Sequence, residues 1–114
     1  MRHEDSDQLA AHYWANDDDG AAWARVDDTV RDGGGEAVAL VELLAATAPD
    51  EESLGRLGAG PLEDLVRWHG VALARQLDAA SGRQPRLRAA LGFVRVGTEH
   101  LNAGESLADF FGLS

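Results

Sequence analysis

The most restrictive absence in this sequence is that of cysteine, which does not occur among the 114 residues. Without thiols the chain forms no disulfide, holds no thiolate-bound zinc and has no cysteine nucleophile. Lysine and isoleucine are also absent, so all 10 basic residues are arginine. The fold must depend on buried apolar side chains, and the length suffices for one ordinary core. We expect a single helical domain over residues 1–114, with residues 1–5 held loosely.

Long hydrophobic runs are missing as well. No apolar segment of the chain approaches the roughly 20 residues that span a bilayer. The segment Met1–Asp7 carries acidic residues, where a secretory leader has a basic part followed by an apolar part. We therefore expect a cytoplasmic protein that does not contact a membrane.

Positive charge is scarce relative to negative charge, and the net charge is −10. Nucleic acids require a basic stripe that binds their phosphates, so we expect no nucleic-acid partner. An acidic chain favours a basic protein partner instead. Acidic residues are concentrated in the first third of the chain, where the candidate acidic surface comprises Asp17, Asp18, Asp19, Asp27 and Asp28.

Segments that alternate apolar and polar residues over the length of a strand are absent, whereas apolar residues recur at helical spacings throughout. The sequence predicts an all-α fold with six to eight short helices and no sheet, arranged as a small bundle or as a short HEAT-like stack of helical hairpins. The third predicted helix is apolar nearly all round and is the expected centre of the core. The predicted helices cover about 6–15, 21–31, 36–48, 51–57 with Asp50 as its cap, 61–80 and 85–96. A final short helix is suggested by Leu101, Leu107, Phe110, Phe111 and Leu113.

The most informative segment is Gly58-Ala59-Gly60-Pro61-Leu62-Glu63-Asp64-Leu65. Pro61 suits the first position of a helix, where its missing N–H would have no intrahelical partner. The segment therefore predicts a hinge followed by an amphipathic helix, on which Glu63 stands four residues before Arg67. The sequence leaves open whether Gly70 interrupts this helix, because the apolar stripe continues in phase beyond it.

Known catalytic and ligand-binding signatures are absent. The pair Gly58-x-Gly60 lacks the third glycine and the preceding strand of a dinucleotide-binding loop. The segment Asn16–Gly20 lacks the oxygen ligands that begin and end a calcium-binding loop. The 4 histidines include no pair four residues apart. We therefore expect no cofactor, no metal site and no catalytic residue.

The candidate interaction site or pocket comprises Glu63, Asp64, Trp68 and His69. His69 falls within the apolar stripe of its helix, and a buried imidazole is most often satisfied by a hydrogen bond to the backbone or to a carboxylate. Core packing is the favoured interpretation of Trp68, and an exposed anchor for a partner is the alternative. Trp23 is spaced with Val26 and Val30 and is expected to face inward with them.

Several segments form a distinctive combination: Trp14 with the acidic residues after it, Ala22-Trp23, Leu57–Leu65, His69-Gly70 and Arg88–Gly92. This combination resembles a family of small bacterial helical proteins known only as a domain of unknown function. The resemblance covers about residues 10–97, and Gly-x-Gly-Pro-Leu-Glu-Asp-Leu is its most specific part. It implies a mostly helical domain and carries over no activity, cofactor or catalytic residue.

The charge, the size and the lack of catalytic signatures favour a non-enzymatic acidic domain that binds another protein, as a toxin-neutralising immunity protein or a small adaptor. One alternative is a small-molecule binder or enzyme with a pocket lined by His69, Glu63 and Trp68. A solvent-open cavity at His69 would support that alternative, whereas a packed His69 bonded to the backbone would remove its basis. Another alternative is an oligomeric scaffold, and the sequence does not decide the oligomeric state.

Overall fold

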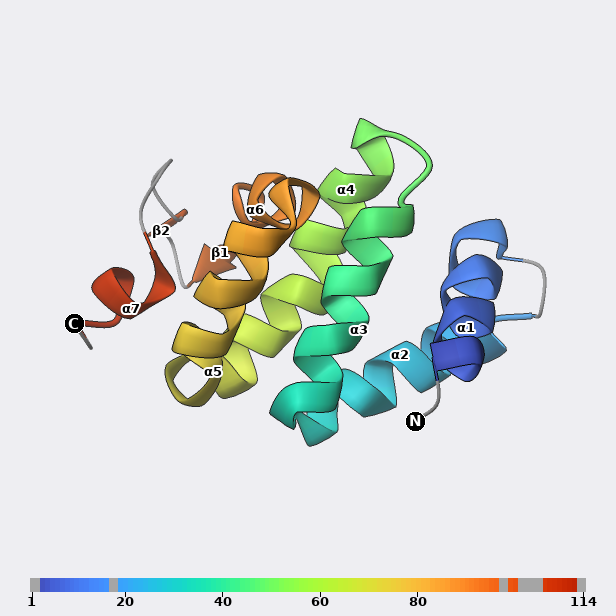
Figure 1. Ribbon diagram of the computed structural model, residues 1–114, viewed down its shortest axis with the longest axis horizontal. Helices are drawn as coiled ribbons and strands as arrows, with labels where there is room; N and C mark the ends of the chain where they lie inside the picture. Colours follow the sequence, from blue (N-terminus) through green and yellow to red (C-terminus); the bar gives the residue numbers. More distant parts are fainter. Residues whose placement is uncertain (1–2, 17–18, 97–98, 101–105, 113–114) are drawn as a thin grey trace.

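The structure is a computed structural model that describes residues 3–16, 19–96, 99–100 and 106–112. Helix α3 crosses the middle of the molecule beside α5, with α1 at one end and α7 at the other (Figure 1). The predicted all-α fold is confirmed. The helices are α1 (His3–Ala15), α2 (Ala21–Asp32), α3 (Gly34–Thr47), α4 (Glu51–Leu57), α5 (Glu63–Arg83), α6 (Pro85–Leu91) and α7 (Leu107–Phe110).

Helices α4 and α5 are separated by a kink in the segment η1 (Gly58–Leu62), where Gly60 has non-helical angles. The expected six to eight helices are slightly more than the described residues show, since α7 is a single turn of 4 residues. Helix α6 ends at Leu91, and a short antiparallel ladder of β1 (Arg95–Val96) and β2 (Glu99–His100) follows it. With 2 residues per strand, this ladder forms no sheet layer and leaves the fold class unchanged.

The hinge predicted before α5 is confirmed as a kink within η1. Gly60 has non-helical angles, φ −118° and ψ −105°, immediately before Pro61. Gly58 is required by packing, because a Cβ atom at this position would lie 2.2 Å from the backbone oxygen of Ala90. The kink changes the direction of the chain and places the first turn of α5 beside α2.

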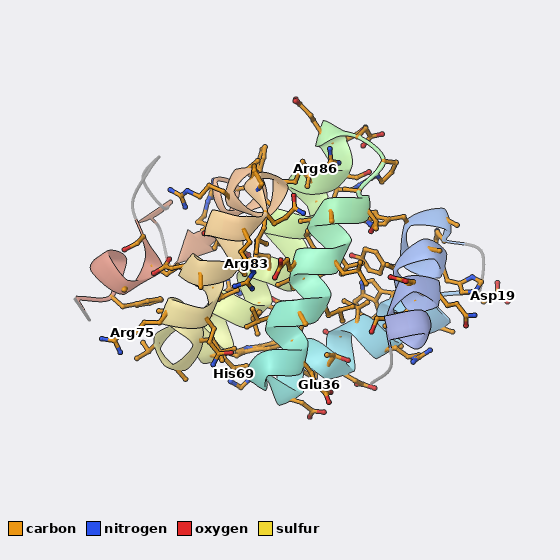
Figure 2. The ribbon with its side chains drawn as sticks, in the orientation of Figure 1. Asp19, Glu36, His69, Arg75, Arg83 and Arg86 are labelled. Atoms are coloured by element: carbon orange, nitrogen blue, oxygen red, sulfur yellow. The ribbon has the colours of Figure 1, made fainter. Side chains whose placement is uncertain are left out.

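Helix α3 is the centre of the core, as the sequence predicts, and it contacts α1, α2, α4, α5 and α6. At its carboxyl end, Arg86 Nε donates to the carbonyl oxygen of Ala45 at 2.9 Å, and Arg86 Nη2 donates to that of Ala48. A cation in this position satisfies carbonyls that have no intrahelical partner (Figure 2). The buried residues of α3 are Ala37, Val38, Leu40, Val41, Leu44 and Ala45.

Gly70 does not interrupt α5, and its lack of a side chain serves the packing of α7. A Cβ atom on Gly70 would come within 2.8 Å of the Phe111 ring. The Asp78 carboxylate accepts hydrogen bonds from the backbone N–H groups of Leu107, at 2.7 Å, and Ala108, at 3.0 Å. These contacts dock the end of the chain on α5, and Leu107 is fully buried there.

Asp50 caps α4, as its position predicts. The Ser53 N–H donates to Asp50 Oδ1 at 2.8 Å. Hydrogen bonding from the Ser53 side chain, and then from its backbone N–H, lowers the pKa of the Asp50 carboxyl, because it stabilises the ionised form.

Candidate functional site

The predicted site residues on α5 have different surroundings. One Glu63 oxygen pairs with Arg67 Nη2 at 3.2 Å, which confirms the expected contact between residues four apart. The other oxygen accepts from the backbone N–H of Arg95 at 2.9 Å. Glu63 therefore ties the first turn of α5 to β1.

His69 caps the carboxyl end of α2. Its Nε2 lies 2.7 Å from the backbone oxygen of Arg31, and because a carbonyl can only accept, Nε2–H is the donor. The ring covers Gly33, where a Cβ atom would lie 2.9 Å from three of its atoms. Figure 2 shows His69 at the end of the molecule where α2 passes into α3. The contact is the backbone hydrogen bond that the sequence favours for this histidine, and its side chain is half-buried.

The predicted helices 21–31 and 36–48 leave residues 33–35 as a loop between them, and in the structure this connection is shorter. Gly33 alone separates α2 from α3, with φ +73°, which an L side chain rarely adopts. Gly34 and Gly35 belong to the first turn of α3. The close approach of His69 and the positive φ together require glycine at position 33.

Trp23 and Trp68 lie on the surface, so the inward orientation predicted for Trp23 is wrong, and of the two interpretations of Trp68 the structure has the exposed one rather than the favoured core packing. Trp23 is 60% exposed and Trp68 is 46% exposed. The buried stripe of α2 consists of Ala22, Val26 and Val30, and Trp23 stands one residue outside it. Trp14 behaves differently, because it packs against the core and its indole N–H donates to the carbonyl oxygen of Leu44 at 3.1 Å.

Helices α2 and α5 together form the surface on which both exposed tryptophans lie. Trp23, Asp27 and Arg31 follow one another at four-residue intervals on α2, and Asp64 and Trp68 do so on α5. The two helices are in contact. We call these residues, Trp23, Asp27, Arg31, Asp64 and Trp68, the α2–α5 surface.

Arg31 connects the two helices across this surface. Its Nε lies 3.0 Å from Asp27 Oδ2, and its Cζ lies 5.5 Å from the centroid of the Trp68 ring. The second distance is within the range of a cation–π contact. One guanidinium is thus held by a carboxylate of α2 and an indole of α5.

A pocket of about 100 Å³ opens between the helices. Its lining combines apolar groups with two carboxylates: Trp23, Val26, Asp27, Val30, Gly60, Pro61 and Asp64. We call it the α2–α5 pocket. Gly60 and Pro61 line the pocket, so the hinge predicted from the segment Gly58–Leu65 also helps to form it.

The surroundings of the Asp64 carboxyl disfavour its ionised form. Partial burial raises its pKa, Arg67 and Arg31 oppose this effect, and the neighbouring carboxylates of Asp27 and Glu63 add to it. Among the described residues, Asp64 takes part in no hydrogen bond or close ion pair. A cation in the pocket would relieve the cost of its charge.

The predicted acidic surface is only partly assembled. Asp17 and Asp18 lie outside the described residues, and Asp19 projects at the far end of the molecule beyond α1 (Figure 2). Asp28 is exposed on α2, whereas Asp27 is half-buried and faces the α2–α5 pocket. Asp27 therefore joins Asp64 and Trp68 in one place, while Glu63 and His69 serve structural contacts.

Other hollows in the described residues are larger than the α2–α5 pocket. One of about 330 Å³ is lined by His12, Tyr13, Trp14, Asn16, Ala22, Trp23 and Arg56. It shares Trp23 with the α2–α5 pocket, so this indole separates two depressions. Another, of about 380 Å³, is lined mainly by residues of α3, with Ser6 of α1 and Gln84, which follows α5, also in its lining. His69 lines none of these three hollows.

The described part of the chain offers no grouping of three or more histidine, aspartate or glutamate side chains that could hold a metal ion. Within the same residues, no helix has the length and apolar character needed to cross a membrane.

Comparison with known proteins gives one match. The model of the family described as "Family of unknown function (DUF6869)" matches residues 11–100. A comparison with curated proteins finds no match, and a comparison with solved structures finds none.

Proposed function

This chain belongs to the family of unknown function (DUF6869), and we propose that it is a non-enzymatic domain that binds another protein through its α2–α5 surface. The observation that carries the proposal is the exposure of two tryptophans on adjacent helices, 60% at Trp23 and 46% at Trp68. Tryptophan is highly buried on average in folded domains and is enriched among the residues that dominate binding energy at interfaces.

The contrast with Trp14 supports this assignment. The Trp14 indole packs against the core and donates to Leu44 and Thr47 of α3, at 3.1 and 3.2 Å. Within the described residues, the Trp23 indole N–H has no acceptor. The indole of Trp23 therefore keeps both its apolar face and its donor available to a partner.

Charge indicates the kind of partner. The net charge of −10 and the carboxylates of Asp27 and Asp64 beside the exposed indoles favour a basic protein. A toxin-neutralising immunity protein and a small adaptor both need such a surface. The two roles differ in whether binding inhibits an activity of the partner.

Affinity capture with the tagged chain, from a lysate of the organism that encodes it, tests the proposal. We expect a specific partner whose capture falls by about tenfold or more in Trp23→Ala and Trp68→Ala, as for central interface aromatics. Phe93→Ala is the matched control, because Phe93 is an aromatic residue of similar exposure, 51%, outside this surface.

Equal capture by the wild type and by both tryptophan variants would refute the proposed surface. An activity assay of the captured partner then separates the two roles. Inhibition by the wild type and its loss in Trp23→Ala indicate an immunity protein, whereas an unaffected activity indicates an adaptor.

A further inference from the structure

We infer that the α2–α5 pocket receives an arginine side chain of the partner, with its guanidinium against the Trp23 indole and beside the carboxylates of Asp27 and Asp64. The inference rests on the proposed function, because it specifies what the partner presents to the α2–α5 surface.

The surface already holds one guanidinium of its own. Arg31 lies over the Trp68 ring, with 5.5 Å between Cζ and the ring centroid, and pairs with Asp27 at 3.0 Å. The Arg31 side chain is 64% exposed, so these two contacts rather than burial hold it in place. An indole face and a carboxylate are thus sufficient on this surface to position an arginine.

The same combination of groups occurs a second time without a cation. Trp23 stands one helical turn before Asp27 on α2, and Asp64 stands one turn before Trp68 on α5. Trp23 and Asp64 line one pocket, and in the described part of the chain neither takes part in an ion pair or a cation–π contact, although Arg67 and Arg31 act on the Asp64 carboxylate from outside ion-pair distance. The ion pair to Arg31 uses Asp27 Oδ2 and leaves Oδ1 for a further donor.

The size and lining of the pocket fit one long side chain. Its volume of about 100 Å³ is smaller than the roughly 300–1,000 Å³ of pockets that take cofactors or other small molecules. Val26 and Val30 are buried in its base, and Pro61 contributes a further apolar group, so methylene groups can pack there. The two carboxylates supply acceptors for the charged end.

Arginine matches this arrangement better than lysine does. A guanidinium is planar, stacks on an indole face and presents several donors at fixed angles, so it can reach two carboxylates at once. An ammonium is a compact point charge that keeps its water more strongly. Partial burial raises the pKa of Asp64, Arg67 and Arg31 oppose this effect, and Asp27 and Glu63 add to it, so the cations already nearby do not fully compensate this carboxylate.

The test uses N-acetyl-arginine methylamide as the probe, titrated into the full-length chain and followed by the indole N–H signals of Trp14, Trp23 and Trp68 in nitrogen–proton correlation NMR. We expect a saturable shift of the Trp23 signal. The Trp14 signal should stay in place, because its N–H is bonded to Leu44. The citrulline analogue, which has the same shape without the charge, should shift neither signal.

Charge variants localise the site. We expect Asp64→Asn to raise the dissociation constant by about threefold to fivefold, as for a partly exposed charge pair, and Asp28→Asn to change it by less than about twofold. Asp28→Asn is matched because it removes the same charge from an exposed position on α2 outside the pocket.

The outcomes separate this inference from the proposed function. Equal binding of the citrulline or lysine analogue, or equal weakening by Asp64→Asn and Asp28→Asn, would overturn the arginine assignment. If Trp23→Ala abolishes partner capture but the arginine probe does not shift the Trp23 signal, the arginine inference fails and the proposed surface stands. If both tryptophan variants capture the partner like the wild type, the proposed function fails whatever the probe does.

Discussion

Helix α5 has two sides that treat their polar and aromatic groups differently. Toward α7, Gly70 accommodates the Phe111 ring, and Asp78 accepts two backbone hydrogen bonds. Toward α2, Trp68 is 46% exposed, and Asp64 makes no close ion pair among the described residues. Both sides contact another helix. On the α7 side, the polar and aromatic groups are used by contacts within the protein, which makes this a structural contact. On the α2 side, such groups are available to a partner, which makes this a candidate interface.

The comparison also explains why adjacent residues differ in role. Trp68 and His69 are neighbours in sequence, and both contact Arg31. His69 uses the backbone carbonyl of Arg31 and thereby fixes the end of α2. Trp68 contacts only the exposed guanidinium end of Arg31. The first contact stabilises the fold, and the second keeps an aromatic face near the surface.

The largest contrast in stability should come from truncating one buried residue on the α7 side and one exposed residue on the α2 side. Leu107 is 0% exposed, so Leu107→Ala should lower the free energy of unfolding by about 2–5 kcal/mol. Trp68→Ala should lower it by less than Leu107→Ala does, because the indole is 46% exposed and its removal leaves no internal cavity. Urea denaturation measures both, and equal losses would contradict the distinction between the two sides.

Removal of the α7 cap should have the next largest effect. Asp78→Ala should destabilise the protein by about 0.5–2 kcal/mol, because two backbone N–H groups of α7 lose their acceptor. Asp28→Ala is the control, since Asp28 is exposed and does not cap a helix. Hydrogen exchange should accelerate at Leu107 and Ala108 in Asp78→Ala only; unchanged exchange would show that the cap does not hold α7.

A smaller effect tests the reason for glycine at position 70. Alanine in place of an interior helical glycine gains about 1 kcal/mol, but in the wild type its Cβ would meet the Phe111 ring at 2.8 Å. We expect Gly70→Ala to stabilise the Phe111→Ala variant by about 1 kcal/mol and to bring no such gain to the wild type. Thermal unfolding of the four proteins in this cycle measures the coupling. Additive effects would mean that Phe111 does not require the glycine.

The smallest change in stability should be that of Asp64→Asn. The folded-state pKa of Asp64 is raised, so its ionised form weakens the fold above the ordinary aspartate pKa, and this cost disappears as the pH falls below that value. The asparagine variant should therefore unfold at an equal or slightly higher temperature than the wild type at neutral pH, and at the same temperature in acid. A lower melting temperature at neutral pH would contradict this.

The ionised carboxylate of Asp50 should have the opposite effect on stability, and the same measurement of unfolding against pH tests it. Its folded-state pKa is lowered by the hydrogen bond from Ser53, so it stabilises the fold above the ordinary aspartate pKa. That contribution is lost as the pH falls through the lowered pKa. Asp50→Asn should thus show its deficit at neutral pH rather than in acid.

Local signals predicted much of the fold. Helical spacing identified the helical segments, and the side-chain chemistry of Asp50 and Pro61 located helix starts, because caps and proline constraints act within one turn. The glycine at position 70 was ambiguous, since its reason lies 41 residues away in Phe111. The ladder at residues 95–100 was missed because two residues per strand carry no periodicity.

The candidate site could be predicted only in part. The four-residue spacing of Trp23, Asp27 and Arg31 was visible in the sequence and would have placed them on one face of α2. Trp23 was instead assigned to the buried stripe, because Ala22 is small and gives a weaker signal than the large indole. The pairing of Asp27 with Asp64 depends on the contact between α2 and α5, which no local pattern encodes.

The sequence by itself determined the all-α class, the absence of thiol chemistry, the acidic charge and the hinge before α5, because each follows from composition or from contacts within one turn of helix. Only the tertiary structure decided that His69 caps α2 and that Trp23 and Trp68 remain exposed around two carboxylates. Those outcomes depend on the packing of α5 against α2 after the kink at Gly60. This packing brings together residues that are distant in sequence.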